Sequence, residues 1–412
     1  MIKQAIALSW INFKSFPHRL VASAISIFSI ACVAAVMLGV LALSSGMVKT
    51  MERTGLDNTL LVMRSGAVSE LQSVMFPMEV KLLSNNAQVL QDKNGQAIIS
   101  AEMFVNAEYK KAQVNTLLAI ETVDLDNKID RDVDSESLSL RGISQNTYLF
   151  RPHFKLVRGE KFATGLRQLI VGQAIARRMP ELVVGGTIIL GGSQWLISGI
   201  FSDNNSVFES ELWADIGTVQ SDYRRGSSVQ SVRLALKDNT DLTKLEQEWQ
   251  ADPRLNVRLI LEKVFFAEQA QNLTRLIRWI GLPIAIVMAL GAIVAALNTM
   301  YAAIASRSKE IATHKAIGFT PFAISLSIIS EALLLAVVGG LLGILPLYIA
   351  FDGWTAATQN ANSLSQMMFN FDISLLLMSQ AMLLSIIIGL LGGILPAIKA
   401  MRMPVTVALR DS

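Results

Sequence analysis

The chain has 412 residues, of which 52% are hydrophobic and only 17% are charged, well below the quarter typical of soluble globular proteins. This balance excludes an ordinary soluble protein and indicates a chain that is partly embedded in a membrane. The net charge of +3, from 36 basic and 33 acidic residues, lacks the excess expected of a nucleic-acid-binding surface. The single cysteine, Cys32, can form no disulfide within the chain and belongs to no metal-binding cysteine cluster.

The first segment, residues 1–19, places apolar side chains near one helical face and Lys3 and Lys14 off it. It predicts either a cytoplasmic amphipathic helix along the membrane surface or a simple extension of the first span. Pro17 favours a break between this segment and the span. The apolar residues of the face are Ile2, Ile6, Trp10 and Phe13.

Four segments are apolar and long enough to cross a bilayer, which takes about 20 residues. The first is too long for the core of a signal peptide, and no clear cleavage site follows it, so we expect a retained anchor. The predicted spans are residues 20–48, 272–304, 320–351 and 372–398.

The basic residues beside these spans predict the orientation of the chain, because short cytoplasmic loops are enriched in Lys and Arg. We expect both termini, the segment 305–319 and the tail 399–412 to be cytoplasmic, and the loop 352–371, which has neither residue type, to lie outside. Arg275 and Arg278 run against this rule, but they adjoin a long loop, and long loops translocate largely regardless of charge. The residues that set the orientation are Lys3, Lys14, Arg19, Arg307, Lys309, Lys315, Lys399, Arg402 and Arg410.

Residues 49–271 are predicted to form a large mixed α/β extracytoplasmic domain. Between two of its strands, Leu242, Leu245 and Trp249 have the spacing of an amphipathic helix, and a strand is expected to turn into a helix at Gly172. The length predicts two subdomains, with a boundary near residues 130–165. Alternating apolar residues predict strands at 58–64, 187–192, 194–201, 231–237 and 256–263. The expected fold class is four transmembrane α-helices plus this domain, inserted between the first and second spans.

The sequence offers no catalytic or metal-binding constellation. It lacks a Gly-x-x-x-x-Gly-Lys-[Ser/Thr] phosphate loop, and Ala174 occupies the centre of "GQAIA", where a nucleophile elbow needs Ser. His18, His153 and His314 are scattered, without a His-Glu-x-x-His motif. We therefore expect a chain that is not an enzyme and holds no metal.

Glu331 is the one internal charge of the third predicted span, a position where a charge is costly and usually functional. Two interpretations stay open. Glu331 has a proton or substrate role, or it lies near enough to the cytoplasmic boundary to be hydrated or to cap against a neighbouring helix.

Two similar glycine-rich stretches, "GGLLGILP" (339–346) and "GLLGGILP" (389–396), occur in the third and fourth spans. Gly339 with Gly343, and Gly389 with Gly393, have the spacing that lets helix backbones approach closely in lipid. Repeats of this kind are common in membrane proteins, so they indicate packing and no particular function.

The run "ASRSKEIATHKAIGFTP" (305–321) interrupts the apolar half of the chain. Arg307, Glu310 and His314 fall on one helical face, where Glu310 can pair with Arg307, and Ile304 and Ile311 fall on another. Gly318 is placed to end a helix before Pro321 opens the next span. The alternative is a solvated loop that merely follows the positive-inside rule.

Several stretches are similar to sequences that recur in one family. They are "RSKEIATHKAIGFTPFAISLSIISEALLLAVVGGLLG" (307–343), "GGILPAIKAMRMPVTVALR" (392–410), "FKLVRGEKF" (154–162) and the segment from "LIVGQAIARRM" to "VGGTIILGGSQWLISGIF". In these stretches the chain resembles the MacB/FtsX-like family of ABC transporter permeases. It departs from the family at Ala312, Phe319 and Glu160, where the family often has Gly, Ala and Arg.

The resemblance implies a non-catalytic permease subunit of the bacterial inner membrane that binds no cofactor itself. Its expected partners are a separate ABC ATPase that binds ATP and Mg²⁺, a second permease copy in a homodimer or a paralogue in a heterodimer, and a periplasmic adaptor protein. The segment 305–319 would be a coupling helix seated on the ATPase. The expected coupling residues are Arg307, Lys309, Glu310, Ile311, His314, Lys315 and Gly318.

The same resemblance implies that ATP-driven motion reaches the extracytoplasmic domain and powers export or extraction of a substrate by mechanotransmission. Two alternatives remain. One is an FtsX-like regulatory subunit that activates an extracytoplasmic hydrolase, and the other is a membrane sensor that works without an ATPase.

Overall fold

The structure is a computed structural model that describes residues 20–110, 135–238, 240–359 and 366–404. The predicted amphipathic segment 1–19 and residues 405–412 of the tail lie outside the described residues. The chain divides into two compact units. The helical unit comprises the residues up to Gly46, Asn272–Trp354 and the residues from Phe371 on, and the sheet unit comprises Met47–Gln271 and Thr355–Asn370.

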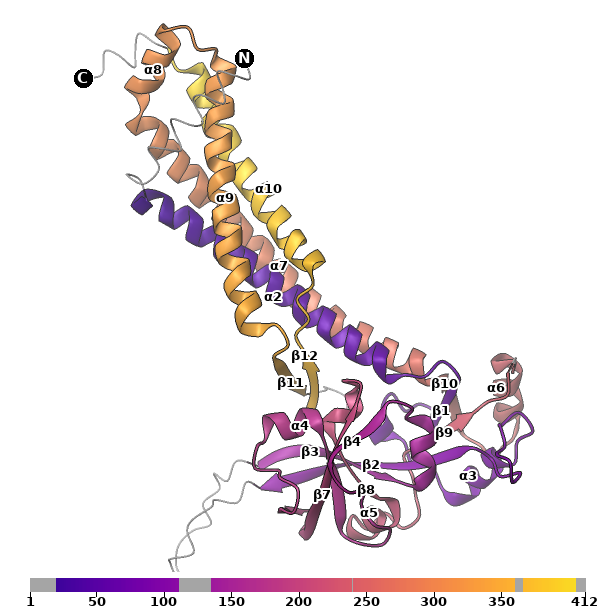
Figure 1. Cartoon of the computed structure of the whole chain (residues 1–412). Coiled ribbons are helices and arrows are strands. Elements are labelled where there is room, and N and C mark those ends of the chain that lie inside the picture. Colours follow the sequence, from indigo (N-terminus) through magenta and orange to yellow (C-terminus); the bar gives the residue numbers. More distant parts are fainter. Residues whose placement is uncertain (1–19, 111–134, 239, 360–365, 405–412) are drawn as a thin grey trace, which may run out of the picture. The chain divides into compact units, whose positions relative to one another are not determined.

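Four helices of the described chain are long and apolar enough to cross a membrane, and they coincide with the four predicted spans (Figure 1). Two of them extend beyond the predicted bounds by more than a turn: α2 continues past residue 48 to Thr54, and α7 begins before residue 272, at Glu262. The polar turns added at these ends belong to the sheet unit. The helices are α2 (Leu20–Thr54), α7 (Glu262–Ser306), the short α8 (Ser308–Ala316), α9 (Pro321–Phe351) and α10 (Leu375–Arg402).

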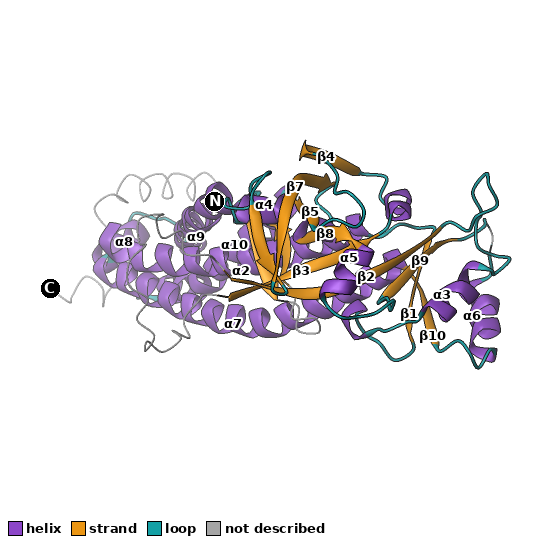
Figure 2. Cartoon of the chain, turned by 90° about the horizontal axis from the view of Figure 1, so that it is seen from below, coloured by secondary structure: helices purple, strands orange, loops and turns teal. Residues whose placement is uncertain are grey.

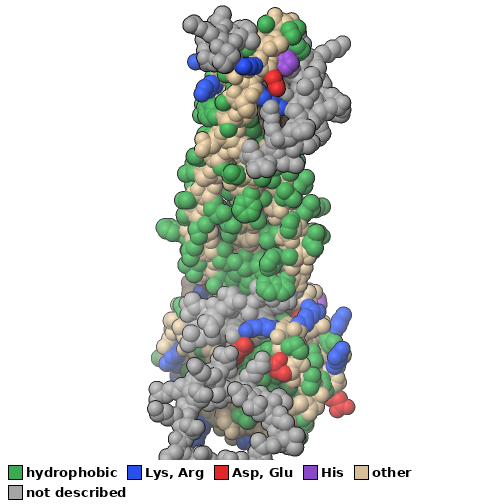
Figure 3. Space-filling model, turned by 90° about the vertical axis from the view of Figure 1, so that its left-hand side faces the viewer, with side chains coloured by type: hydrophobic (Ala, Val, Ile, Leu, Met, Phe, Trp, Pro, Cys, Tyr) green, Lys and Arg blue, Asp and Glu red, His purple; other side chains and the backbone are tan. Residues whose placement is uncertain are grey.

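Small residues and hydroxyl groups hold the helical unit together. The Ser26 hydroxyl on α2 donates to Thr299 Oγ1 on α7 at 2.7 Å, a contact of the kind that links helices in lipid. Apolar side chains cover the middle of the helices on the face seen in Figure 3, and charged side chains gather at the end that carries α8. This distribution is typical of helices surrounded by lipid.

The sheet unit contains a ten-stranded mixed sheet whose main path is β10-β1-β9-β2-β3-β8-β5-β7-β4, with β6 paired to β2 and β7 (Figure 2). The pairs β3–β8 and β5–β7 are parallel, and the other pairs are antiparallel. The strands are β1 (Thr59–Arg64), β2 (Ile99–Lys110), β3 (Ser135–Ile143), β4 (Phe154–Gly159), β5 (Gln168–Gly172), β6 (Thr187–Leu190), β7 (Ser193–Asp203), β8 (Glu211–Asp215), β9 (Ser231–Ala235) and β10 (Val257–Leu261).

Short helices cover this sheet and bury two apolar clusters. One cluster includes Leu140 and Trp195, and the other includes Leu245 and Trp249 on α6. Strand β2 contributes to both clusters, so the sheet is continuous between them. The division into two subdomains stays a prediction, and part of its expected boundary lies outside the described residues. The short helices are η2 (Glu70–Gln72), α3 (Pro77–Ser84), η3 (Gln145–Phe150), α4 (Gln173–Arg178), η4 (Val207–Ser210), α5 (Ile216–Asp222) and α6 (Leu242–Ala251).

A third buried group in the sheet unit is ionic, and we call it the charge cluster. Arg141 lies 2.7 Å from Glu211 and 2.9 Å from both Glu70 and Glu102, and Arg233 lies 2.6 Å from Glu102. Multiple charge-assisted hydrogen bonds offset the cost of removing these groups from water. The members are Glu70, Glu102, Arg141, Arg151, Glu211, Arg233 and Glu262, all at most 8% exposed.

The carboxylates of Glu70 and Glu102 in the charge cluster are held in their ionised form. Burial by itself raises the pKa of the Glu70 carboxyl, but the guanidinium groups of Arg141 and Arg233 outweigh burial and hold that pKa well below its usual range. The pKa of Glu102 is lowered in the same way, by Arg233, Arg141 and Arg151 against the effect of burial. Both carboxylates are therefore charged at neutral pH.

The loop between the third and fourth spans forms a β-hairpin, which the sequence did not predict. Strand β11 (Thr355–Gln359) pairs with β12 (Gln366–Asn370) in register Thr355↔Asn370. This hairpin belongs to the sheet unit, where β12 packs against η4 and α4 and Phe369 is 3% exposed.

The predicted fold class is confirmed, with a mixed α/β domain between the first and second of four long apolar helices. All five predicted strands are present, as β1, β6, β7, β9 and β10. The predicted helix between the last two is α6, with Leu245 and Trp249 buried, and β5 gives way to α4 at Gly172.

Candidate functional site

The segment between α7 and α9 is a short helix with sharply defined ends. The chain leaves helical geometry at Arg307 (φ −110°, ψ 13°), and α8 then runs from Ser308 to Ala316. At its end Gly318 has φ +102°, the Gly318 N–H donates to Lys315 O, and the Phe319 N–H donates to His314 O. These two bonds form the Schellman motif, and the positive φ favours glycine at this position.

An apolar core fixes one face of α8. Ile304 and Ile311 pack with Ile324 and Ile328 of α9, and Ala397 and Ala400 of α10 join the same cluster. Ile311 is 8% exposed and Ala312 is 1% exposed. Ile311, predicted to contact an ATPase, is therefore part of the interior and holds α8 against α9 and α10.

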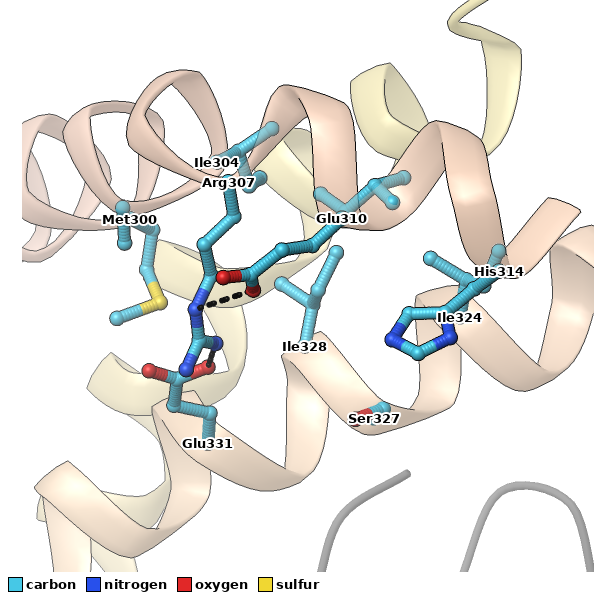
Figure 4. Close-up of a pocket in the computed structure, with 11 residues that line it drawn as sticks. Met300, Ile304, Arg307, Glu310, His314, Ile324, Ser327, Ile328 and Glu331 are labelled. Carbon is cyan, nitrogen blue, oxygen red and sulfur yellow. Dashed lines mark hydrogen bonds and ion pairs between the residues drawn. The ribbon is translucent and has the colours of Figure 1, made fainter. Parts of the chain in front are cut away.

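Arg307 and Glu331 form an ion pair that joins the start of α8 to α9. Arg307 Nη1 donates to Glu331 Oε2 at 3.1 Å, and the two side chains are 8% and 12% exposed. Arg307 Nε also lies 3.7 Å from the more exposed carboxylate of Glu310, as Figure 4 shows. Glu331 thus has an ion-pair partner about three turns into α9, at the end of the span that adjoins α8.

Lys315 anchors α8 to the end of α10. Its ammonium group donates to the carbonyl oxygens of Ala400, Met401 and Met403, at 2.9, 3.1 and 2.7 Å. These carbonyls belong to the last turn of α10 and its C-cap, and a cation is favourable at the negative end of a helix dipole. Partial burial lowers the pKa of Lys315.

The remaining face of α8 is open. Lys309, Glu310, Thr313 and Gly318 are exposed, and Ile317 is 71% exposed. Ile317 was not among the predicted coupling residues. Its position directly after the helix and before Gly318 is the only sequence signal that could have identified it.

A small cavity of about 40 Å³ lies between the end of α7, α8 and the start of α9. Figure 4 shows Arg307, Glu310 and Glu331 gathered at one end of its lining and His314 at the other. The His314 ring packs edge-on against Phe319, with 5.5 Å between the ring centroids. The cavity is too small for a nucleotide, and no metal-binding group of three or more His, Cys, Asp or Glu occurs in the part of the chain that the structure describes.

The four predicted packing glycines all lie at helix–helix contacts. A Cβ on Gly339 would come within 3.0 Å of Ile30 on α2, and one on Gly343 would overlap the backbone of Ala31. Gly389 and Gly393 on α10 face Ala336 and Ala332 on α9 in the same manner. The structure thus places one pair against α2 and the other against α9.

Comparison with protein families covers most of the chain. Residues 283–405 match the family described as FtsX-like permease C-terminal, and residues 23–252, more than half of the chain, match the MacB-like periplasmic core domain. The chain belongs to the MacB/FtsX-like family of ABC transporter permeases. It is accordingly a multi-pass membrane protein with an extracytoplasmic domain, in a family whose members are typically non-catalytic and pair with ABC ATPases.

Solved structures similar to this MacB/FtsX-like permease are distant in sequence. The periplasmic region of MacB from Actinobacillus actinomycetemcomitans is 13% identical (53% of this chain, 94% of that one; TM-score 0.36). The extracellular domain of the transporter YknZ from Gram-positive bacteria is 11% identical, and the match covers 49% of this chain and 100% of that one with a TM-score of 0.34. A domain of a putative permease protein from Porphyromonas gingivalis is 12% identical, and the match covers 50% of this chain and 90% of that one with a TM-score of 0.33. A search of curated proteins found no significant match.

Proposed function

We propose that this permease couples ATP hydrolysis by a separate ABC ATPase to motion of its sheet unit, which drives export or extraction of a substrate. Two copies, or one copy and a paralogue, form the membrane part, with both termini in the cytoplasm of a bacterial inner membrane. ATP and Mg²⁺ are bound by the ATPase, since this sequence has no phosphate loop.

The arrangement of α8 is the observation that carries the proposal. Its inner face is fixed to α9 and α10 by the Ile311 core, by the Arg307–Glu331 pair and by Lys315. Its outer face offers Lys309, Glu310 and the exposed Ile317. A short helix that is rigidly held on one side and exposed on the other can pass a displacement of its partner to two membrane helices at once.

The match of residues 23–252 to the MacB-like periplasmic core domain supports export or extraction over the activation of an extracytoplasmic hydrolase. A periplasmic adaptor is a further proposed partner, and its contact would lie on the sheet unit.

The outer face of α8 can be tested by charge reversal. Glu310 is exposed and only loosely paired with Arg307, so Glu310→Lys and Ile317→Asp should leave the permease folded. Both should weaken ATPase association by about ten-fold or more, because reversing a charge in an interface costs more than removing it. Copurification of the ATPase and ATP hydrolysis in lipid measure the effect.

Two matched variants serve as controls for this experiment. Glu310→Gln removes the charge without reversing it and should have a smaller effect, and Thr313→Ser on the same exposed face should be nearly silent. Parent-like ATPase association and turnover in both Glu310→Lys and Ile317→Asp would show that α8 is only a solvated connection.

A further inference from the structure

Three parts of the chain that are far apart in sequence meet at η4 inside the sheet unit. They are the end of α2, the start of α7 and the hairpin strand β12. All four residues of η4, from Val207 to Ser210, are buried.

The end of α2 is tied to η4 by a buried hydrogen bond. The Val207 N–H donates to Thr54 Oγ1 at 2.9 Å, and the Thr54 hydroxyl donates to Thr50 O at 2.7 Å within the last turn of α2. Directly after Thr54, a Cβ on Gly55 would overlap the backbone of Lys263. The end of α2 and the start of α7 are therefore in backbone contact beside η4.

The start of α7 is tied to Phe208. The Phe266 ring lies edge-on to Phe208, with 5.9 Å between the ring centroids. The Arg151 guanidinium lies 3.8 Å from the centre of the Phe208 ring and 3.4 Å from Glu262, the first residue of α7. Phe208 thus contacts α7 directly and also through the charge cluster.

The hairpin and the sheet complete these contacts. Strand β12 packs against η4. The Glu209 carboxylate accepts hydrogen bonds from the backbone N–H groups of Asp203 and Asn205, at 2.7 and 2.8 Å, which fixes η4 to the end of β7. On β5, a Cβ at Gly172 would overlap the Glu209 backbone, so the backbone of η4 lies directly against β5.

We propose that η4, with Phe208 as its central positioning residue, transmits movement of the membrane spans to the sheet unit. This inference rests on the proposed function. Helices α2 and α7 reach η4 themselves, and the hairpin that contacts η4 joins α9 to α10. A displacement of any span is therefore delivered to one short segment that is fixed to β5 and β7.

The test measures ATP-driven motion of the sheet unit in the full permease–ATPase complex. In a Cys32→Ser background, which has no cysteine, spin labels are placed through Lys244→Cys on α6 and Leu375→Cys on α10, whose side chains are 79% and 83% exposed. The distance between the labels is measured in lipid nanodiscs with and without ATP and Mg²⁺. The parent should show an ATP-dependent shift.

Two variants address η4, and each has a matched control. Phe208→Leu should retain no more than about half of the shift, with ATPase association and turnover within about two-fold of the parent. Trp195→Phe alters a buried ring in the apolar cluster that includes Leu140, to which Phe208 does not belong, and should keep the shift. Thr54→Val removes the acceptor of the Val207 N–H at nearly constant shape and should reduce the shift, whereas Thr54→Ser keeps the hydroxyl and should not.

The outcomes separate the two proposals. A parent-sized shift in Phe208→Leu, or an equal loss in Trp195→Phe, would overturn the role of η4 while leaving the proposed function intact. If Phe208→Leu does not fold, the Thr54 pair decides, and a parent-sized shift in Thr54→Val overturns the inference. A parent complex without ATPase association or without any shift contradicts the proposed function and the inference with it.

Discussion

At the scale of single residues, the charge cluster places three buried arginines around one aromatic ring of the sheet unit. The guanidinium groups of Arg141, Arg151 and Arg233 all lie within 5.7 Å of the centre of the Phe208 ring. The alternation of side chains around Arg233 predicts a strand, but it does not indicate that both faces of this strand are covered. That cover comes from η4 and the start of α7, which are distant in sequence, so no local pattern could identify the cluster.

Removal of one cation from the charge cluster should strongly destabilise the sheet unit. Arg141→Met leaves Glu70, Glu102 and Glu211 buried with one partner fewer, which typically costs about 3–5 kcal/mol. Chemical denaturation of the detergent-solubilised chain, followed by tryptophan fluorescence, measures the loss.

Arg167→Met is the control for that measurement, since Arg167 pairs with Asp222 while its side chain is 54% exposed. This variant should be destabilised far less than Arg141→Met, because exposed ion pairs contribute little to stability. Equal losses in the two variants would show that burial does not set the strength of the Arg141 contacts.

At the scale of elements, the sequence predicted what depends on local composition. The apolar runs identified the four long helices, and Gly318 and Pro321 marked the end of α8 and the start of α9. The hairpin β11–β12 was missed because its partner surface, η4, is supplied by another part of the chain. Spacing along α8 likewise gave its faces but could not tell which face α9 and α10 would bury, and so it gave no sign that Ile311 is buried and Ile317 is exposed.

The close helix contacts predict a position-dependent effect of enlarging glycines in the spans. Gly343→Leu and Gly393→Leu force side chains into Ala31 and Ala332 and should lower both the yield of folded protein and its melting temperature. Gly291→Leu on α7 is the control, since a Cβ at Gly291 meets nothing within 4 Å. If all three variants behave like the parent, the helices do not approach as closely as the structure shows.

At the scale of the whole molecule, the chain passes between its two units four times, after Gly46, Gln271, Trp354 and Asn370. The basic residues beside the spans predict on which side of the membrane each loop and each terminus lies. A reporter fused after Gln271 or within 355–365 should be active on the outside, and one at residue 308 or after Ser412 should be active in the cytoplasm. Alkaline phosphatase and green fluorescent protein fusions distinguish the two sides, and a reversal at any of the four sites would refute the predicted topology.

The hairpin has a consequence for biosynthesis. Residues 47–271 leave the ribosome first, but β12, which packs against η4, follows only after residues 272–354 have been made. Strand β12 is complete only when residue 370 has been added, 99 residues after residue 271, and at about 5–20 residues per second that interval lasts roughly 5 to 20 s. During it the surface of η4 that β12 later covers is exposed. The sheet unit therefore completes its folding only after the third long helix has been synthesised, and a chaperone has that interval in which to bind it.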